Sequence, residues 1–230
     1  MLRLLGYFAL VFLTVFVLRY IPWIGGLFRI PFLGFMLAAA IVSIGLAKVG
    51  TLAVDSRRAK NLERSLGAVE TPHNQGKLGC LLLSQGRARK ALPLLERAVA
   101  GDSGAGEWSY RLGLAYLAVN RAPDAARTLE RAAEIDEERA YGAVLLRLSE
   151  ARLAAGEAAG ALDAVARFER NHGHNPESAY RRGLALRSLG KPAEAKSAFS
   201  EVARLAAQSA RFQKSAQRAY VFRAWLQGLR

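Results

Sequence analysis

Apolar residues from about residue 72 to residue 209 recur at helical spacing, and their arrangement returns after 34, 36 and 34 residues. In each copy a small residue is followed 12 residues later by an alanine and 16 residues later by a bulky apolar residue. The small residues are Gly79, Gly113, Ser149 and Gly183, the alanines are Ala91, Ala125, Ala161 and Ala195, and the bulky residues are Leu95, Leu129, Val165 and Phe199. Such a period predicts stacked helix–turn–helix units, because one unit cannot bury its apolar face alone.

Glycine and proline mark a turn between the two helices of each unit. The turns are predicted at 85–86, 120–123, 155–156 and 189–192. Gly86, Gly156 and Gly190 suit the end of a first helix, where a left-handed backbone conformation is favoured. Pro123 and Pro192 suit the first turn of a second helix, because the N–H that proline lacks would have no partner there.

The repeated residues resemble the tetratricopeptide repeat family, over about residues 72–209 in four copies. The resemblance implies an all-α fold in which about four helix–turn–helix units form a right-handed superhelix with flanking capping helices. Proteins of this architecture use an extended concave surface to bind other proteins and rarely carry catalytic chemistry. We therefore expect a protein-binding scaffold and no enzyme activity.

Two departures from the family pattern concern packing. The aromatic residue expected near the start of each first helix is replaced by Gln75, Ser109, Leu145 and Ala179. Arg152 and Arg182 occupy positions where apolar packing residues are usual. We therefore expect the third and fourth units to pack less regularly than the first two.

Amphipathic segments flank the repeats and are predicted to cover the ends of the stack. Residues 50–71 form a predicted connecting and capping helix that ends at Thr71-Pro72. Residues from about 203 to 230 form a predicted basic amphipathic capping helix. A second role for this helix is docking on an anionic membrane surface, through Phe222, Trp225, Arg218 and Arg223.

The first 49 residues are apolar and predict a membrane anchor of two spans, at about 4–24 and 30–49. Residues 4–18 alone rise only about 22 Å as a helix, short of the roughly 30 Å hydrocarbon core, so the first span must continue past Arg19. A cleaved signal peptide is the competing interpretation, although no small-residue cleavage site follows Leu18. Pro22, Gly25 and Gly26 separate the spans, which predicts a helical hairpin.

Basic residues near the span ends predict the orientation of this anchor. Lys48, Arg57, Arg58, Lys60 and Arg64 follow the second span, whereas only Arg19 and Arg29 flank the short loop. The positive-inside rule then places the repeats in the cytoplasm, at the inner membrane of a presumed bacterium. The opposite topology would make the protein a periplasmic accessory of protein export or envelope assembly.

Charge favours acidic partners. The chain has 33 basic and 19 acidic residues, and because residues 1–49 hold four basic and no acidic ones, residues 50–230 carry a net charge of +10. Such a domain attracts acidic protein segments, anionic lipid or nucleic acid. An arginine-rich helical surface without a binding role is the alternative. We expect protein partners with acidic segments and a lipid bilayer, with nucleic acid as the less favoured partner.

No group of residues has the pattern of a catalytic or metal site. Residues 101–106 are glycine-rich but lack a following Lys-Ser/Thr, so an inter-repeat turn explains them better than a phosphate loop. His172 and His174 have no cysteine or acidic cluster at ligand spacing, which favours turn residues over a metal site. Cys80 is the single cysteine, excludes an internal disulfide, and is predicted to pack inside the repeat. We expect no cofactor.

A line of basic residues is the strongest candidate for a binding surface. The residue two positions before each small residue is Lys77, Arg111, Arg147 or Arg181. The resemblance places this position on the concave groove, where basic residues of some family members hold the carboxylate end of a peptide. Arginine binds carboxylates in a bidentate manner. We call these four residues the basic stripe, and predict Tyr110 and Tyr180 as aromatic surface beside it.

The family's complete carboxylate clamp also needs an asparagine directly after the small residue of one repeat. The four positions hold Cys80, Leu114, Glu150 and Leu184, so the full clamp is absent. The sequence therefore predicts a membrane-tethered scaffold or assembly factor that holds acidic segments or C-termini of partners, with a binder of anionic lipid or nucleic acid as an alternative.

Overall fold

A computed structural model of the protein describes residues 60–209 and 214–228. The chain divides into two compact units, Met1–Leu62 and Glu63–Arg230, and helices α3 to α11 belong to the second. Every regular element of the described residues is helical. The all-α prediction is confirmed for this part of the chain.

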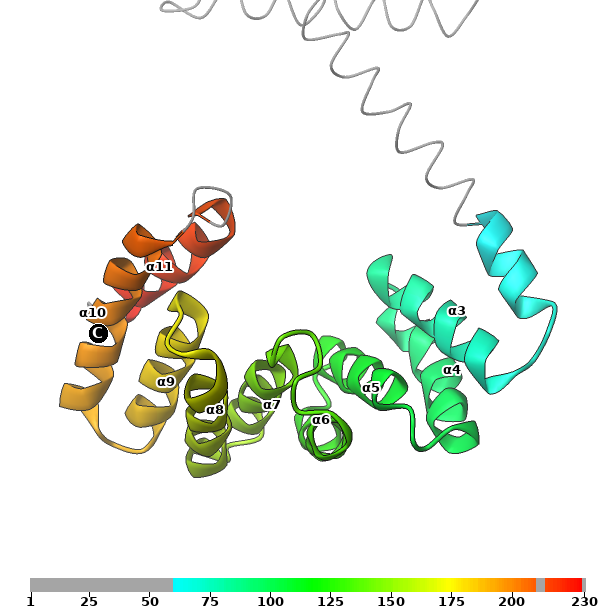
Figure 1. Cartoon of the computed structure of the whole chain (residues 1–230), viewed down its shortest axis with the longest axis horizontal. Helices are drawn as coiled ribbons and strands as arrows, with labels where there is room; N and C mark the ends of the chain where they lie inside the picture. Colours follow the sequence, from blue (N-terminus) through cyan, green and yellow to red (C-terminus); the bar gives the residue numbers. More distant parts are fainter. Residues whose placement is uncertain (1–59, 210–213, 229–230) are drawn as a thin grey trace, which may run out of the picture. The chain divides into compact units, whose positions relative to one another are not determined.

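Helices α3 to α11 form four consecutive pairs and a last single helix (Figure 1). The pairs are α3 (Pro72–Ser84) with α4 (Ala88–Gly101), α5 (Gly106–Ala118) with α6 (Ala122–Ile135), α7 (Ala143–Ala154) with α8 (Ala158–His172), and α9 (Pro176–Ser188) with α10 (Pro192–Gln208), followed by α11 (Lys214–Gly228). The first pair opens at Thr71, whose hydroxyl accepts a hydrogen bond from the Asn74 backbone N–H at 3.2 Å. The four pairs extend from Pro72 to Gln208.

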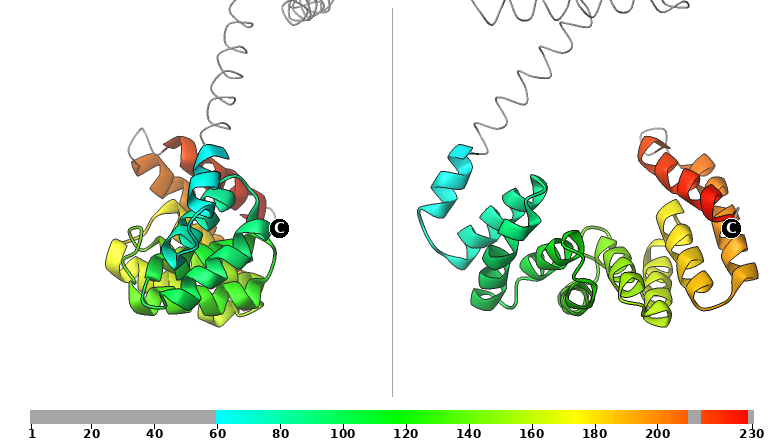
Figure 2. Two further views of the ribbon diagram at one scale, coloured as in Figure 1. Left: turned by 90° about the vertical axis from the view of Figure 1, so that its right-hand side faces the viewer. Right: turned by 180° about the vertical axis from the view of Figure 1, so that it is seen from behind.

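The pairs follow one another along a curved stack, and its two sides are lined by different helices. The first helices of neighbouring pairs, α3, α5, α7 and α9, contact one another in order. They lie on the inner side of the curve, with α4, α6, α8 and α10 on the outer side (Figures 1 and 2). Equivalent positions of the first helices are therefore brought side by side.

Close approach of the two helices in each pair depends on the small residue of the first helix. A Cβ atom at Gly79 would lie 2.6 Å from Leu95 Cγ, and one at Gly113 would lie 2.4 Å from Leu129 Cγ. At Gly183 the obstacle would be Phe199 Cε1, at 2.5 Å. The third pair has a buried serine, Ser149, at this position and the smaller valine at the bulky one. The repeating alanines are also buried, at 0 to 2% exposure.

The turns within the pairs adopt the predicted left-handed conformation. The φ angles of Gly86, Gly156 and Gly190 are +73°, +84° and +73°. Asn120 takes the equivalent place in the second pair with φ +60°, since asparagine is one of the few residues other than glycine that tolerate this region. Pro123 and Pro192 lie in the first turn of their helices, as predicted.

One polar position recurs between neighbouring pairs. The Tyr116 hydroxyl on α5 donates to Glu96 Oε1 on α4 at 2.7 Å, and Arg152 on α7 donates to Glu130 on α6. Tyr116 and Arg152 both lie three residues after the small residue, and both glutamates directly follow the bulky residue of the preceding pair. The same site therefore holds a hydrogen bond from a tyrosine hydroxyl in one interface and an ion pair in the next.

Arg152 and Arg182, which occupy positions where apolar residues are usual, have polar partners in the stack. Arg152 Nη1 also donates to the Gly160 carbonyl at 3.0 Å. Arg182 bridges Glu169 on α8, at 2.7 Å, and Glu201 on α10. Because these carboxylates satisfy both guanidinium groups, polar bridges replace apolar contacts and the third and fourth pairs still stack.

The C-terminal segment differs from its prediction as one helix over about 203–230. Helix α10 continues to Gln208, and Ser209 leaves the helical conformation with φ −71° and ψ 153°. Helix α11 then begins at Lys214. Helical periodicity is shared by both segments, so the pattern of apolar residues could not reveal the break between them.

The membrane location predicted from the sequence is corrected. Within residues 60–209 and 214–228, no helix combines the length and the apolar character needed to cross a bilayer. The longest of helices α3 to α11, α10, has 17 residues and rises about 26 Å, less than the roughly 30 Å of a hydrocarbon core. The spans predicted at about 4–24 and 30–49 lie outside the described residues.

The contact between Gly113 and Leu129 generates a test of pair packing. We expect Gly113→Ala to lower the free energy of unfolding by about 2 kcal/mol, because the added methyl group overlaps Leu129. The loss should be smaller in a Leu129→Val background, which reproduces the smaller partner of the third pair. Denaturant unfolding of the four variants measures both values. Gly67→Ala, with no atom within 4 Å of the new Cβ, is the control, and equal losses in both backgrounds would contradict the packing argument.

The Tyr116 contact generates a test of alkaline stability. Burial and the hydrogen bond to Glu96 raise the pKa of Tyr116 to about 12. The stability that this contact adds is therefore fully present below the ordinary tyrosine pKa of about 10 and is lost as the pH rises toward 12. The difference in unfolding free energy between the wild type and Tyr116→Phe should stay constant below that window and shrink within it. A difference that does not depend on pH would show that the shift is absent.

Candidate functional site

The basic stripe lies along the inner helices of the stack. Lys77 is on α3, Arg111 on α5, Arg147 on α7 and Arg181 on α9, and each of these helices contacts the next. Their exposure falls along the stack: Lys77 is exposed, and the side chains of Arg111, Arg147 and Arg181 are 42%, 29% and 8% exposed. The structure therefore aligns the four residues but does not make them equally accessible.

A carboxylate pairs with the second member of the stripe. Arg111 Nε donates to Glu107 Oε1 at 2.7 Å, one helical turn earlier on α5. The other oxygen of Glu107 accepts a hydrogen bond from Arg139 Nη1 at 2.8 Å. Burial would raise the pKa of Glu107, but the hydrogen bonds and charges of the two arginines hold it below its ordinary value. Glu107 is therefore ionised at neutral pH and neutralises part of the stripe.

Two further carboxylates join the last two members of the stripe into one network. Arg147 contacts Glu150 at 2.7 Å and Glu177 at 2.8 Å. Arg181 contacts the same two residues, at 3.0 and 2.7 Å. Burial opposes ionisation of Glu150, yet Arg181 and Arg147 hold its pKa below the ordinary value. The network links α7 to α9, so these arginines hold the stack together as well as lying on its inner side.

The two tyrosines predicted beside the stripe are mostly covered. Tyr110 is 8% exposed, and burial raises its pKa. Tyr180 is half-buried, and its ring lies 6.0 Å from that of Phe199 and 5.9 Å from that of Tyr220 on α11. Both rings therefore take part in packing, and neither presents a broad open face.

The residues that the sequence analysis did not predict are the three glutamates that form ion pairs with the basic stripe. Glu107 and Glu177 precede Arg111 and Arg181 by four residues, and Glu150 follows Arg147 by three. Helical residues three and four apart lie side by side, so this spacing could have revealed the pairing. Within the described residues, Lys77 is the member of the stripe without an ion-pair partner.

The residues weighed as chemical groups have structural surroundings. Cys80 is half-buried, and burial raises the pKa of its thiol. Residues 101–106 join α4 to α5, as expected of a turn. His172 stacks on Phe168 with ring centroids 4.9 Å apart, and its Nε2 lies 3.2 Å from Glu138 Oε2. Across the parts of the chain that the structure describes, no three His, Cys, Asp or Glu side chains are arranged to hold a metal ion.

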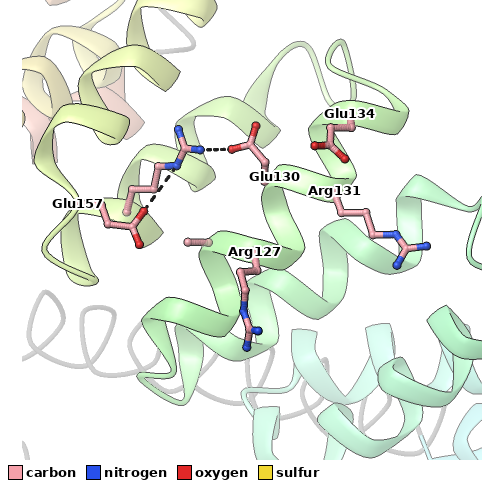
Figure 3. Close-up of a pocket in the computed structure, with 7 residues that line it drawn as sticks. Arg127, Glu130, Arg131, Glu134 and Glu157 are labelled. Carbon is pink, nitrogen blue, oxygen red and sulfur yellow. Dashed lines mark hydrogen bonds and ion pairs between the residues drawn. The ribbon is translucent and has the colours of Figure 1, made fainter.

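A hollow of about 500 Å³ on the outer side of the stack is less suited to a ligand. It is lined by Ala126, Arg127, Glu130, Arg131, Glu134, Arg152 and Glu157 (Figure 3). Its charges balance, and Arg152 is already engaged with Glu130 and Glu157. Arg127 and Arg131 extend away from Glu157, so these polar groups do not converge on one point. Convergent polar groups are what a small-molecule site requires.

Comparison with known proteins identifies the repeats. No curated protein matches the chain. Two sequence models of protein families, both described as tetratricopeptide repeat, match this chain. They match residues 82–148 and 146–210, which together cover more than half of the chain. Tetratricopeptide repeats generally form non-enzymatic scaffolds for protein interaction.

Solved structures share the fold at low identity. A crystal structure of MamA protein is 21% identical over 67% of this chain and 86% of its own, with a TM-score of 0.59. TTC0263, a thermophilic tetratricopeptide repeat protein of Thermus thermophilus, is 18% identical over 78% of this chain and 95% of its own, with a TM-score of 0.56.

YrrB, described as a tetratricopeptide repeat protein with an unusual peptide-binding site, is 19% identical over 73% of this chain and 84% of its own, with a TM-score of 0.54. These likenesses concern the fold and agree with the family matches and with the four observed helix pairs. The chain belongs to the tetratricopeptide repeat family.

Proposed function

We propose that this chain is a non-enzymatic scaffold that binds an acidic segment or the C-terminus of a partner protein at the α3–α5 end of its inner surface. The observation that carries the proposal is the falling exposure of the basic stripe. Lys77 is exposed and without an ion-pair partner among the described residues, and Arg111 is the most exposed of the three arginines. A carboxylate ligand can reach these two cations without first breaking a buried ion pair.

The other end of the stripe is less suited to a ligand. Arg181 is 6% exposed as a residue and contacts both Glu150 and Glu177. An acidic ligand there would meet two carboxylates and would have to displace them, which like-charge repulsion opposes. Arg147 and Arg181 therefore act chiefly as supports that fix the spacing of α7 and α9.

The net charge of the domain enters this proposal only indirectly. Much of the positive charge is matched locally, because Arg111, Arg139, Arg147 and Arg181 all contact glutamates. Long-range attraction raises the rate of encounter with acidic partners and weakens as salt is added. Selectivity for a peptide must then come from the few accessible cations.

Charge reversal at the exposed end tests the binding surface. A fluorescent peptide with four acidic residues and a free carboxylate end is the probe, read by anisotropy. We expect Lys77→Glu/Arg111→Glu to weaken its binding at least tenfold, about 1.4 kcal/mol. Lys90→Glu/Arg97→Glu, on exposed positions of the outer helix α4, changes net charge equally and should have a much smaller effect. Equal losses in the two double variants would mean that net charge alone drives binding.

Removal of the buried cation tests its supporting role. Arg181→Met should lower the free energy of unfolding by about 2 kcal/mol, because Glu150 and Glu177 lose a shared partner in a partly buried network. Lys77→Met should change it by less than about 0.5 kcal/mol, as expected of an exposed side chain. Thermal or denaturant unfolding measures both. An Arg181→Met variant as stable as the wild type would remove the distinction between the two ends of the stripe.

A further inference from the structure

Helix α11 occupies the position that the first helix of a fifth pair would take. It contacts α10 and α9, just as α9 contacts α8 and α7. Its packed side consists of Ala224, which is 3% exposed, with half-buried Tyr220 and Val221. Each of α3, α5, α7 and α9 is covered on another side by the second helix of its own pair. Among the described residues, no second helix follows α11.

The opposite side of α11 carries an apolar patch that would suit such a second helix. Phe222, Trp225 and Leu226 are 60%, 59% and 42% exposed, and the rings of Phe222 and Trp225 stack with centroids 6.1 Å apart. Other large exposed apolar residues of the described chain are scattered over several segments. An apolar face rimmed by polar groups marks an interaction site.

The charged residues of the C-terminal segment that holds this patch have one sign. From Val202 to Arg230 the sequence has no acidic residue, and the basic residues there are Arg204, Arg211, Lys214, Arg218, Arg223 and Arg230. Arg218 and Arg223 are exposed and, within residues 60–209 and 214–228, have no ion-pair partner. A complementary ligand therefore carries acidic residues beside an apolar surface.

We propose that this face of α11 binds an amphipathic helix of a partner protein, which adds to the stack as the second helix of a fifth pair. The apolar stripe of the partner helix covers Phe222, Trp225 and Leu226, and acidic residues beside the stripe pair with Arg218 and Arg223. This is the helix-in-groove type of recognition, in which one apolar helix face anchors the ligand. The site is distinct from the basic stripe on the inner helices and does not depend on it.

Charge disfavours an occupant from this chain. Residues 1–71, which precede the first pair, hold eight basic residues and three acidic ones. The second helices of another copy, α4, α6, α8 and α10, are already packed in their own pairs. An acidic helix from another protein is the occupant that both the apolar patch and its basic rim favour.

A peptide derived from a second helix of the chain provides the probe. Its sequence is that of Ala122–Ile135 with Arg127 and Arg131 replaced by glutamate, and a basic counterpart carries lysine in place of Asp124, Glu130 and Glu134. Binding to the full-length chain is measured by anisotropy of the labelled peptide and by tryptophan emission. The emission of Trp225 is obtained as the difference between the wild type and Trp225→Phe, because the chain has three tryptophans, and it shifts to shorter wavelength when the indole is covered. We expect the acidic peptide to bind at least tenfold more tightly than the basic one.

Surface variants assign the bound peptide to this face. Phe222→Ala should weaken the acidic peptide at least tenfold, and Arg218→Glu/Arg223→Glu should reverse the preference toward the basic peptide. Tyr141→Ala removes an aromatic side chain that is 90% exposed elsewhere and should leave binding unchanged. Unchanged thermal unfolding of each variant shows that the fold is retained.

Any one of five results would overturn the proposal. The acidic peptide does not bind, or it binds no better than the basic peptide. Its binding is abolished by Lys77→Glu/Arg111→Glu but not by Phe222→Ala, which assigns it to the inner surface. Trp225 emission shifts with vesicles containing phosphatidylglycerol but not with the peptide. The chain forms a dimer that Phe222→Ala dissociates, which makes a second copy the occupant.

Discussion

The stack depends on the close contact between a small residue in each first helix and a bulky residue in the second. Gly113 leaves Leu129 the space that a Cβ atom would fill, and Gly183 does the same for Phe199. The bulky residues are almost completely buried, and burial of such side chains stabilises the fold by about 2 kcal/mol each. Because each pair is closed by this contact, its remaining apolar surface faces the neighbouring pairs, and the curved stack follows.

Electrostatic pairing then decides which part of the inner surface can meet a partner. The four cations of the basic stripe are brought into line by the repeat, but their accessibility is set by glutamates. Glu150 and Glu177 bridge Arg147 and Arg181 across two helices, so that end of the stripe stabilises the stack. The α3–α5 end keeps its cations accessible, and an acidic ligand gains most from a cation whose charge is not already matched.

Helix α11 presents a separate surface because, among the described helices, it packs only against α9 and α10. In α11 the packed side includes buried Ala224. On the uncovered side Phe222 and Trp225 are exposed beside Arg218 and Arg223. Terminal helices of repeat proteins ordinarily present a polar outer face, since an apolar one favours association. An aromatic face at this end is therefore the feature that most favours a second binding partner.

The sequence by itself determined the period, the helix pairs, the left-handed glycines of the turns and the alignment of the basic stripe, because all of these depend on local conformation and a fixed repeat. The tertiary structure decided what spacing along the chain does not report. It placed Glu177 against Arg147, 30 residues away, buried Arg181, divided the C-terminal segment into α10 and α11, and left Phe222 exposed. The physical reason is that exposure and charge pairing are set by side chains from neighbouring units, which come together only when the helices stack.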